Sequence, residues 1–306
     1  MEPRFSLPDS TPRSSKKEIV IGGLRAYVYG LEELKHKSDV DIAVLYLAHN
    51  RTRTYLVTEC IAQEVLNRYR TDGRVKKLEL IAVTFNMRNH GDREISPAAN
   101  RTWKDGNEAH GVDLLSLIDG SAQDFQLLLN YMPAYLRGFR RFYNVVGGVS
   151  LGAHMAWRMA ALSGDQIHAM WMVVGCPNLT SLLLSRLDVN PADLNTTAEQ
   201  LYKVPYDDLY TVMTEEQRRK WPRRLSEILR DSDRAIDEEF PAHIPLLLQN
   251  GLLDQLVPYK YTMPWVDKYK NSRAVEFFVQ DNTGHSCTKE MVANIAVWLA
   301  KLFQEV

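Results

Sequence analysis

The stretch from residue 143 to residue 156 constrains the fold of this chain more than any other. A short apolar run leads into the pentapeptide Gly-Val-Ser-Leu-Gly at 148–152, and a helical pattern follows at once. In a Gly-x-Ser-x-Gly turn between a strand and a helix, the serine hydroxyl points away from both elements. The two glycines lack the Cβ atoms that would collide where the strand and the helix pass closest. The pattern therefore predicts a sharply turned serine, Ser150, at the end of a buried strand.

Strand and helix patterns alternate along most of the chain. Nearly unbroken apolar runs, typical of strands that are covered on both faces, occur at 40–48, 78–85, 169–176, 244–251 and 274–279. Apolar residues at helical spacing occur at 54–70, 109–136, 259–269 and 289–303. Two short β-type stretches on either side of Gly22-Gly23 predict a hairpin at a sheet edge. This alternation predicts an α/β fold with a mostly parallel central sheet and helices on both faces.

The alternation stops between the 169–176 and 244–251 strands, where the pattern is helical and polar. We interpret residues 178–241 as an inserted helical cap or lid. The core into which it is inserted then comprises 17–177 and 242–306. Residues 1–16 are rich in proline, serine and charge, and we expect them to form a mobile N-terminal arm. A single domain with an insertion suits a chain of 306 residues.

Composition argues against several classes of function. The chain has 37 Lys and Arg residues against 38 Asp and Glu residues, so its net charge of −1 gives no reason to expect a nucleic-acid or anionic-membrane partner. No apolar run reaches the roughly 18 residues of a membrane span. Three cysteines without metal-type spacing, Cys60, Cys176 and Cys287, favour reduced thiols in the cytoplasm. The histidines show no metal-binding spacing either, so we expect neither a metal nor a cofactor.

Two late loops carry candidate partners for Ser150. A serine hydroxyl is a poor nucleophile until a base removes its proton, and a third group must orient that base. Asp254 lies in Gly-Leu-Leu-Asp-Gln-Leu-Val-Pro, directly after the 244–251 strand. His285 lies in Thr-Gly-His, after the 274–279 strand. The chain thus has a serine, an acid and a histidine in that order, each after a predicted strand.

This order and these motifs resemble the α/β-hydrolase superfamily, and the resemblance runs from about Glu18 to the end of the chain. The serine turn is similar to the superfamily's nucleophile elbow, and the two late loops are similar to its acid and histidine turns. The resemblance implies the α/β-hydrolase fold and a triad in which Ser150 attacks an acyl carbonyl, His285 transfers the proton and Asp254 orients the imidazole. The segment 86–94 is also similar to a group of uncharacterised fungal hydrolases.

The resemblance further implies an oxyanion hole with two hydrogen-bond donors. One donor should be the backbone N–H of Leu151, which follows the serine. The other should come from the loop after the 40–48 strand, where the superfamily often has His-Gly and this chain has His49-Asn50-Arg51. Asn50 replaces a glycine that lets the backbone approach the substrate, so Asn50 and Arg51 are both candidates.

A cap of this length predicts a covered pocket that excludes large polymers. Candidate pocket residues are His49, Trp103, Tyr206 and Tyr210. We therefore predict a serine hydrolase that cleaves a carboxylic ester or similar acyl bond of a small, fairly apolar molecule through an acyl-enzyme intermediate.

Other functions fit the same pattern. A short-peptide peptidase and a thioester or carbon–carbon bond hydrolase in a biosynthetic pathway are alternatives, because the same triad serves them all. A non-catalytic ligand-binding protein on the same fold is a further alternative, which the replaced glycine at Asn50 keeps open. The cap and the edge hairpin are the candidate surfaces for a homodimer.

Overall fold

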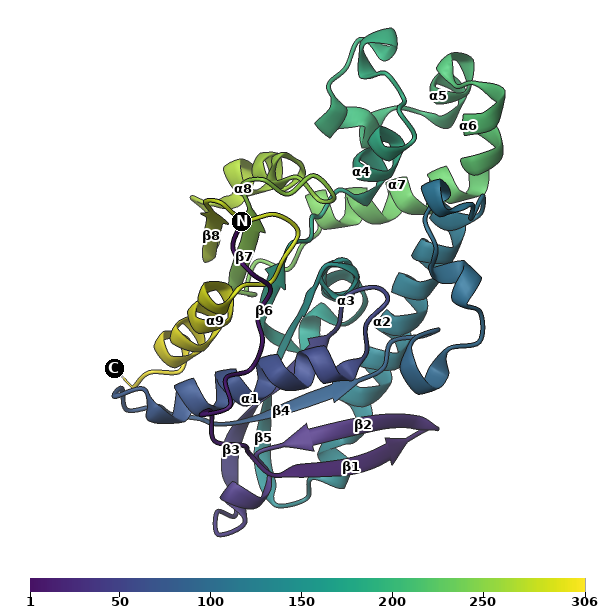
Figure 1. Cartoon of the computed structure of the whole chain (residues 1–306). Helices are drawn as coiled ribbons and strands as arrows, with labels where there is room; N and C mark the ends of the chain where they lie inside the picture. Colours follow the sequence, from purple (N-terminus) through teal and green to yellow (C-terminus); the bar gives the residue numbers. More distant parts are fainter. Residues whose placement is uncertain (306) are drawn as a thin grey trace.

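A computed structural model describes residues 1–305 of the chain. Its centre is an eight-stranded sheet in the order β1-β2-β4-β3-β5-β6-β7-β8 (Figure 1). β2 runs antiparallel to both of its neighbours, and all other neighbouring strands are parallel. The strands are β1 (Lys16–Ile21), β2 (Leu24–Tyr29), β3 (Val40–Ala48), β4 (Glu79–Phe85), β5 (Phe139–Val149), β6 (Ile167–Val173), β7 (Leu246–Gly251) and β8 (Val275–Gln280). The predicted edge hairpin and the mostly parallel sheet are both confirmed.

The strand order places a crevice where a ligand can bind. β3 lies between β4 and β5, so the chain leaves β3 toward one side of the sheet and later continues from β5 toward the other. In open α/β sheets, ligands bind beyond the carboxyl ends of the strands at such a switch point. Here those ends are occupied by the loop after Ala48 and the turn after Val149.

Helices cover both faces of the sheet, which explains the unbroken apolar strands. Along β3, Val44 and Tyr46 face one buried cluster while Ala43 and Leu45 face the other. The first cluster includes residues of α2 (His110–Tyr135), α3 (Leu151–Ser163) and α8 (Met263–Tyr269). The second includes residues of α1 (Tyr55–Thr71) and α9 (Lys289–Leu302).

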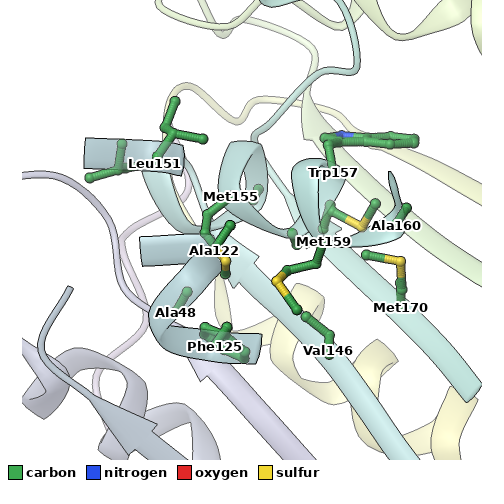
Figure 2. Close-up of a cluster of buried hydrophobic side chains, with 14 of the residues drawn as sticks. Ala48, Ala122, Phe125, Val146, Leu151, Met155, Trp157, Met159, Ala160 and Met170 are labelled. Atoms are coloured by element: carbon green, nitrogen blue, oxygen red, sulfur yellow. The ribbon is translucent and has the colours of Figure 1, made fainter. Parts of the chain in front are cut away.

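Helix α3 is buried along most of its length, and this fixes the position of its first turn. Figure 2 shows the inward side chains of α3, among them Met155 and Met159, in the first cluster with Phe125 of α2 and Val146 of β5. Unbranched methionines adapt to irregular gaps between helix and sheet. The helix therefore begins at a well-defined point directly after Ser150.

The predicted helical stretch after β6 consists of helices and 3-10 turns, with no strand among its residues, all of which the structure describes. Its α-helices are α4 (Leu179–Arg186), α5 (Tyr206–Val212), α6 (Glu215–Lys220) and α7 (Arg223–Glu238). Figure 1 shows them grouped beyond one end of the sheet, where an inserted cap is expected. Within residues 1–305, no helix is both long enough and apolar enough to cross a membrane.

The N-terminal arm, which we expected to be mobile, lies against the core instead. The backbone N–H groups of Glu2 and Phe5 donate to the carbonyl oxygens of Asn282 and Cys287, each at 2.7 Å. Further hydrogen bonds join Thr11 to Glu64 and Ser14 to Gln63. The arm has a polar composition, which suggested mobility, but its backbone amides donate to carbonyl oxygens in the loop before α9. Figure 1 shows the arm running from the β7–β8 end of the sheet to β1.

Candidate active site

Ser150 occupies a strained turn between β5 and α3. Its backbone has φ 55° and ψ −110°, a combination that non-glycine residues rarely adopt. A Cβ atom on Gly148 would lie 2.5 Å from the carbonyl carbon of Gly152, and one on Gly152 would lie 2.2 Å from the Ala48 oxygen. The two glycines are therefore needed for the close approach that the sequence predicts. A hydrogen bond of 2.9 Å from Ser150 N–H to Val173 O holds the turn against β6.

The structure brings the three candidate triad residues together. Ser150 Oγ lies 2.8 Å from Nε2 of His285, and His285 Nδ1 lies 2.8 Å from Oδ2 of Asp254. Asp254 comes from the loop after β7 and His285 from the loop after β8. The three side chains thus meet at the carboxyl ends of three parallel strands.

Hydrogen bonds fix which nitrogen of His285 carries the proton in this Ser150–His285–Asp254 triad. The Asp254 side chain is fully buried, and its Oδ1 accepts backbone N–H bonds from Leu256 at 2.9 Å and Val257 at 3.0 Å. A carboxylate with these donors accepts hydrogen bonds only, so Nδ1 of His285 carries the proton that points at it. Nε2 is then free to accept the proton of the Ser150 hydroxyl.

The prediction that His49 lines the substrate pocket is wrong. The His49 ring is fully buried, Nδ1 donates to Asn50 O at 2.9 Å, and Nε2 accepts from Met87 N–H at 3.0 Å. Burial lowers the pKa of His49 to about 3, so the ring is neutral and satisfied at both nitrogens. His90 supports the same loop by accepting from Thr52 N–H at 3.0 Å. His49 therefore supports the loop after β3 from the core side, through its hydrogen bonds to Asn50 O and Met87 N.

The candidate oxyanion donors line the cavities at Ser150. Leu151 is the first residue of α3, so its N–H has no acceptor within the helix. Asn50 lines a small cavity of about 20 Å³ together with Ser150 and His285. Arg51 and Leu151 line a larger cavity that also contains Ser150. Asn50 and Arg51 thus each line a cavity that Ser150 also lines.

The larger cavity has a volume of about 490 Å³ and extends from Ser150 and His285 to the cap. Trp103 lines it, and its indole ring packs edge-on against His110 at 4.9 Å between centroids. Much of the remaining wall is apolar, formed by Leu114, Leu151, Leu179, Leu182, Leu256 and Val257. A cavity of this size and character suits a small molecule with an apolar portion.

Tyr206 and Tyr210 do not line this cavity, contrary to the prediction. Their rings pack against each other at 6.0 Å between centroids. The guanidinium groups of Arg218 and Arg223 lie over them, at 4.0 Å from the Tyr210 ring and 4.5 Å from the Tyr206 ring. These cation–π contacts hold both tyrosines within the cap, away from Ser150.

Sequence reasoning missed several polar residues of the cavity, among them Arg186 and His154. Arg186 ends helix α4 and interrupts an apolar run, and a charged residue in such a run is a signal that could have been used. His154 lies one helical turn after Ser150, and its Nδ1 donates to Cys176 O at 3.2 Å. Burial, with the nearby charge of Arg186, lowers the pKa of His154 to about 3. No group of three or more His, Cys, Asp or Glu side chains within residues 1–305 is arranged to hold a metal ion.

Comparison with known proteins identifies the fold. No protein-family model matches the chain, and no curated protein matches it in sequence. The solved structure of TT1662 from Thermus thermophilus is similar over 96% of this chain and 100% of its own, with 14% identity and a TM-score of 0.64. EstE1, a thermostable carboxylesterase cloned from a metagenomic library, matches over 97% of this chain and 92% of its own, with 14% identity and a TM-score of 0.57.

A puromycin-hydrolyzing peptidase of Mycobacterium tuberculosis is also similar in structure. It matches over 98% of this chain and 40% of its own, with 13% identity and a TM-score of 0.55. Identities this low carry the fold and not the substrate. The strand order, the serine turn and these structural relatives together show that the chain has the α/β-hydrolase fold.

Proposed function

We propose that this protein is a serine hydrolase that cleaves a carboxylic ester or similar acyl bond of a small molecule through an acyl-enzyme intermediate. The observation that carries the proposal is the continuous hydrogen-bond chain from Ser150 Oγ through His285 to Asp254, with both links at 2.8 Å. The serine end of this chain opens into the 490 Å³ cavity, where a substrate carbonyl can reach it.

Acylation follows from the protonation pattern. His285 Nε2 takes the hydroxyl proton as Ser150 Oγ forms a bond to the acyl carbon, and Asp254 stabilises the resulting imidazolium. The carbonyl oxygen becomes an oxyanion, which accepts hydrogen bonds from Leu151 N–H and from the Asn50–Arg51 backbone. The bond to the leaving group then breaks, and the leaving alcohol takes the proton from Nε2.

Deacylation repeats these steps with water. His285 removes a proton from the water as its oxygen attacks the acyl carbon, and the imidazolium returns that proton to Ser150 Oγ when the acid is released. Each proton that leaves a nucleophile is thus returned to a leaving group, and the enzyme regains its starting state.

The proposal is tested by ester turnover. The wild type should hydrolyse p-nitrophenyl acetate or butyrate, and Ser150→Ala should reduce kcat by several orders of magnitude. Ser116→Ala, a serine exposed on α2, is the matched control and should match the wild type. Activity that survives in a folded Ser150→Ala protein would contradict the proposal.

The other candidate functions are outcomes of a wider screen. Turnover of short peptides, thioesters or carbon–carbon bonds in preference to esters would reassign the substrate while keeping the serine chemistry. Binding of a ligand with no turnover of any acyl compound would favour the non-catalytic alternative.

A further inference from the structure

The cavity beside Ser150 contains two arginines that form no ion pair with an acidic side chain. Arg51 and Arg186 both line it, together with Ser150 and His285. Among the ion pairs formed within residues 1–305, none includes either of these two arginines. Two positive charges therefore face the space in which the substrate must bind.

Arg186 is partly buried, as is Arg51. Its Nη2 donates to the backbone oxygen of Leu256, while its Nε is buried and has no hydrogen-bond partner. Burial and the nearby charge of Arg51 both lower the pKa of Arg186 from its usual value, but an arginine keeps its proton in proteins. A partly buried charge that forms no ion pair is costly, so an anion bound at Arg186 would be stabilised.

Arg51 extends the same donor surface, and His110 lies beside it. Arg51 Nη1 donates to Asn100 O at 2.8 Å, and no further partner for its side chain is found within the described chain. His110 lines the cavity with a buried Nδ1 that has no partner. Burial, with the charges of Arg51 and Arg186, lowers the pKa of His110 to about 4, so the neutral ring adds no charge to the cavity.

The acidic side chains that line the cavity form no ion pair with these arginines. Asp105 accepts hydrogen bonds from the hydroxyl and backbone N–H of Thr102, at 2.6 and 3.2 Å, and Asp188 is exposed. Asp254 is occupied by His285 and two backbone amides. Lys104 adds a further positive charge to the wall.

We propose that Arg186, with Arg51, binds a carboxylate of the substrate, so that the enzyme prefers acids that carry an ester or similar acyl bond to neutral esters. A guanidinium matches a carboxylate through two parallel hydrogen bonds. The apolar walls of the cavity suit the chain between the carboxylate and the scissile bond. This inference rests on the proposed function, because it assumes that Ser150 cleaves that bond. It changes the expected substrate from a fairly apolar molecule to one that has an apolar middle and an anionic end.

Half-esters of dicarboxylic acids provide a direct test. Monoethyl adipate and diethyl adipate share the scissile bond and differ in the free carboxylate. The wild type should have the higher kcat/KM for the half-ester, measured by proton release in a pH-stat. Arg186→Gln should lower the ratio of half-ester to diester kcat/KM at least about tenfold, and Arg186→Lys should lower it less.

The matched control is Arg224→Gln on helix α7, where the side chain is 80% exposed and lies outside the cavity. It removes the same charge and should keep the wild-type ratio. A wild type that prefers the diester, or a ratio that falls equally in Arg186→Gln and Arg224→Gln, would overturn the inference.

A binding measurement separates this inference from the proposed chemistry. In a Ser150→Ala background, calorimetry should detect monoethyl adipate, and adding Arg186→Gln should weaken its binding at least about tenfold. This result without turnover in the wild type would keep the carboxylate site and reject the hydrolase. Equal binding of monoethyl adipate with and without Arg186 would reject the carboxylate site. So would a protein that binds phenyl phosphate but not benzoate, because it would select a phosphate over a carboxylate.

Discussion

Gly152 and Ala48 touch backbone to backbone: a Cβ atom added to Gly152 would lie 2.2 Å from the carbonyl oxygen of Ala48. This contact joins the first turn of α3 to the end of β3, and so fixes Ser150 relative to the loop that carries Asn50 and Arg51. The distance between the serine and its candidate oxyanion donors thus depends on the absence of one methyl group.

Gly152→Ala should therefore destabilise the protein and reduce its activity. Backbone cannot move aside as a flexible side chain can, and overpacking of this kind costs about 1–3 kcal/mol or more. Urea unfolding measures the loss of stability. Gly138→Ala, at an exposed glycine with no atom within 4 Å of the added Cβ, is the control and should unfold as the wild type does. Equal stability of the two variants would contradict the account of the turn.

Asp254→Asn should leave the protein folded and reduce kcat on the order of 10³- to 10⁴-fold. The amide cannot hold Nδ1–H of His285 as the carboxylate does, so the imidazole loses the tautomer that places a lone pair at Ser150. Steady-state kinetics with the best ester substrate measures this, and circular dichroism checks the fold. Asp267→Asn on α8, a half-exposed aspartate paired with Lys270, should keep full activity.

Stability should fall as the pH is lowered from 7 to 5, because burial lowers the pKa of several histidines and keeps them neutral in the folded state. The pKa of His49 and of His154 is about 3 in the folded chain, against about 6.5 when unfolded. His110 has a folded pKa of about 4. The unfolded chain therefore binds more protons below pH 6.5, and each histidine near pKa 3 removes about 2 kcal/mol between pH 7 and 5.

His49→Gln tests this origin of the acid sensitivity. The variant should show a loss of stability between pH 7 and pH 5 that is smaller by about 2 kcal/mol than the wild-type loss. His36→Gln, at an exposed position, should show the wild-type loss. An unchanged pH dependence in His49→Gln would mean that His49 does not contribute as described.

The N-terminal arm should support the histidine loop. Phe5 packs against the cluster beneath α1 and α9 and lines the small cavity shared by Ser150 and His285. Phe5→Ala should cost about 1–2 kcal/mol of stability, since the ring is only partly buried, and should lower kcat by loosening the segment around Cys287. Ser6→Ala, at an exposed neighbour, is the control. A kcat equal to that of the wild type would limit the arm to a structural role.

The serine turn and the triad could be predicted because their signals are local. The glycines around Ser150 are required by backbone contacts within a few residues, and Asp254 and His285 each follow a strand whose apolar run is unmistakable. Parallel strands bring such loops to one edge of the sheet whatever the rest of the chain does. Short segments of the sequence are thus enough to predict the serine, the acid and the histidine of the site.

The pocket could not be predicted because it depends on how the cap packs. Tyr206 and Arg186 both lie in the cap, and only the position of each helix decides which of them reaches the cavity. His49 shows a different failure, since a histidine beside a candidate oxyanion loop can face either the substrate or the core. Its two hydrogen bonds, to Asn50 O and Met87 N, turn the ring toward the core. No sequence pattern predicts these two bonds.

The central claim is that Ser150 is an activated nucleophile, and labelling with a small fluorophosphonate tests it most directly. Intact-mass spectrometry with peptide mapping should find one adduct, on Ser150, in the wild type. The adduct should be absent in Ser150→Ala and formed much more slowly in His285→Ala. A folded wild type that forms no adduct, or one that is labelled at another serine, would contradict the account.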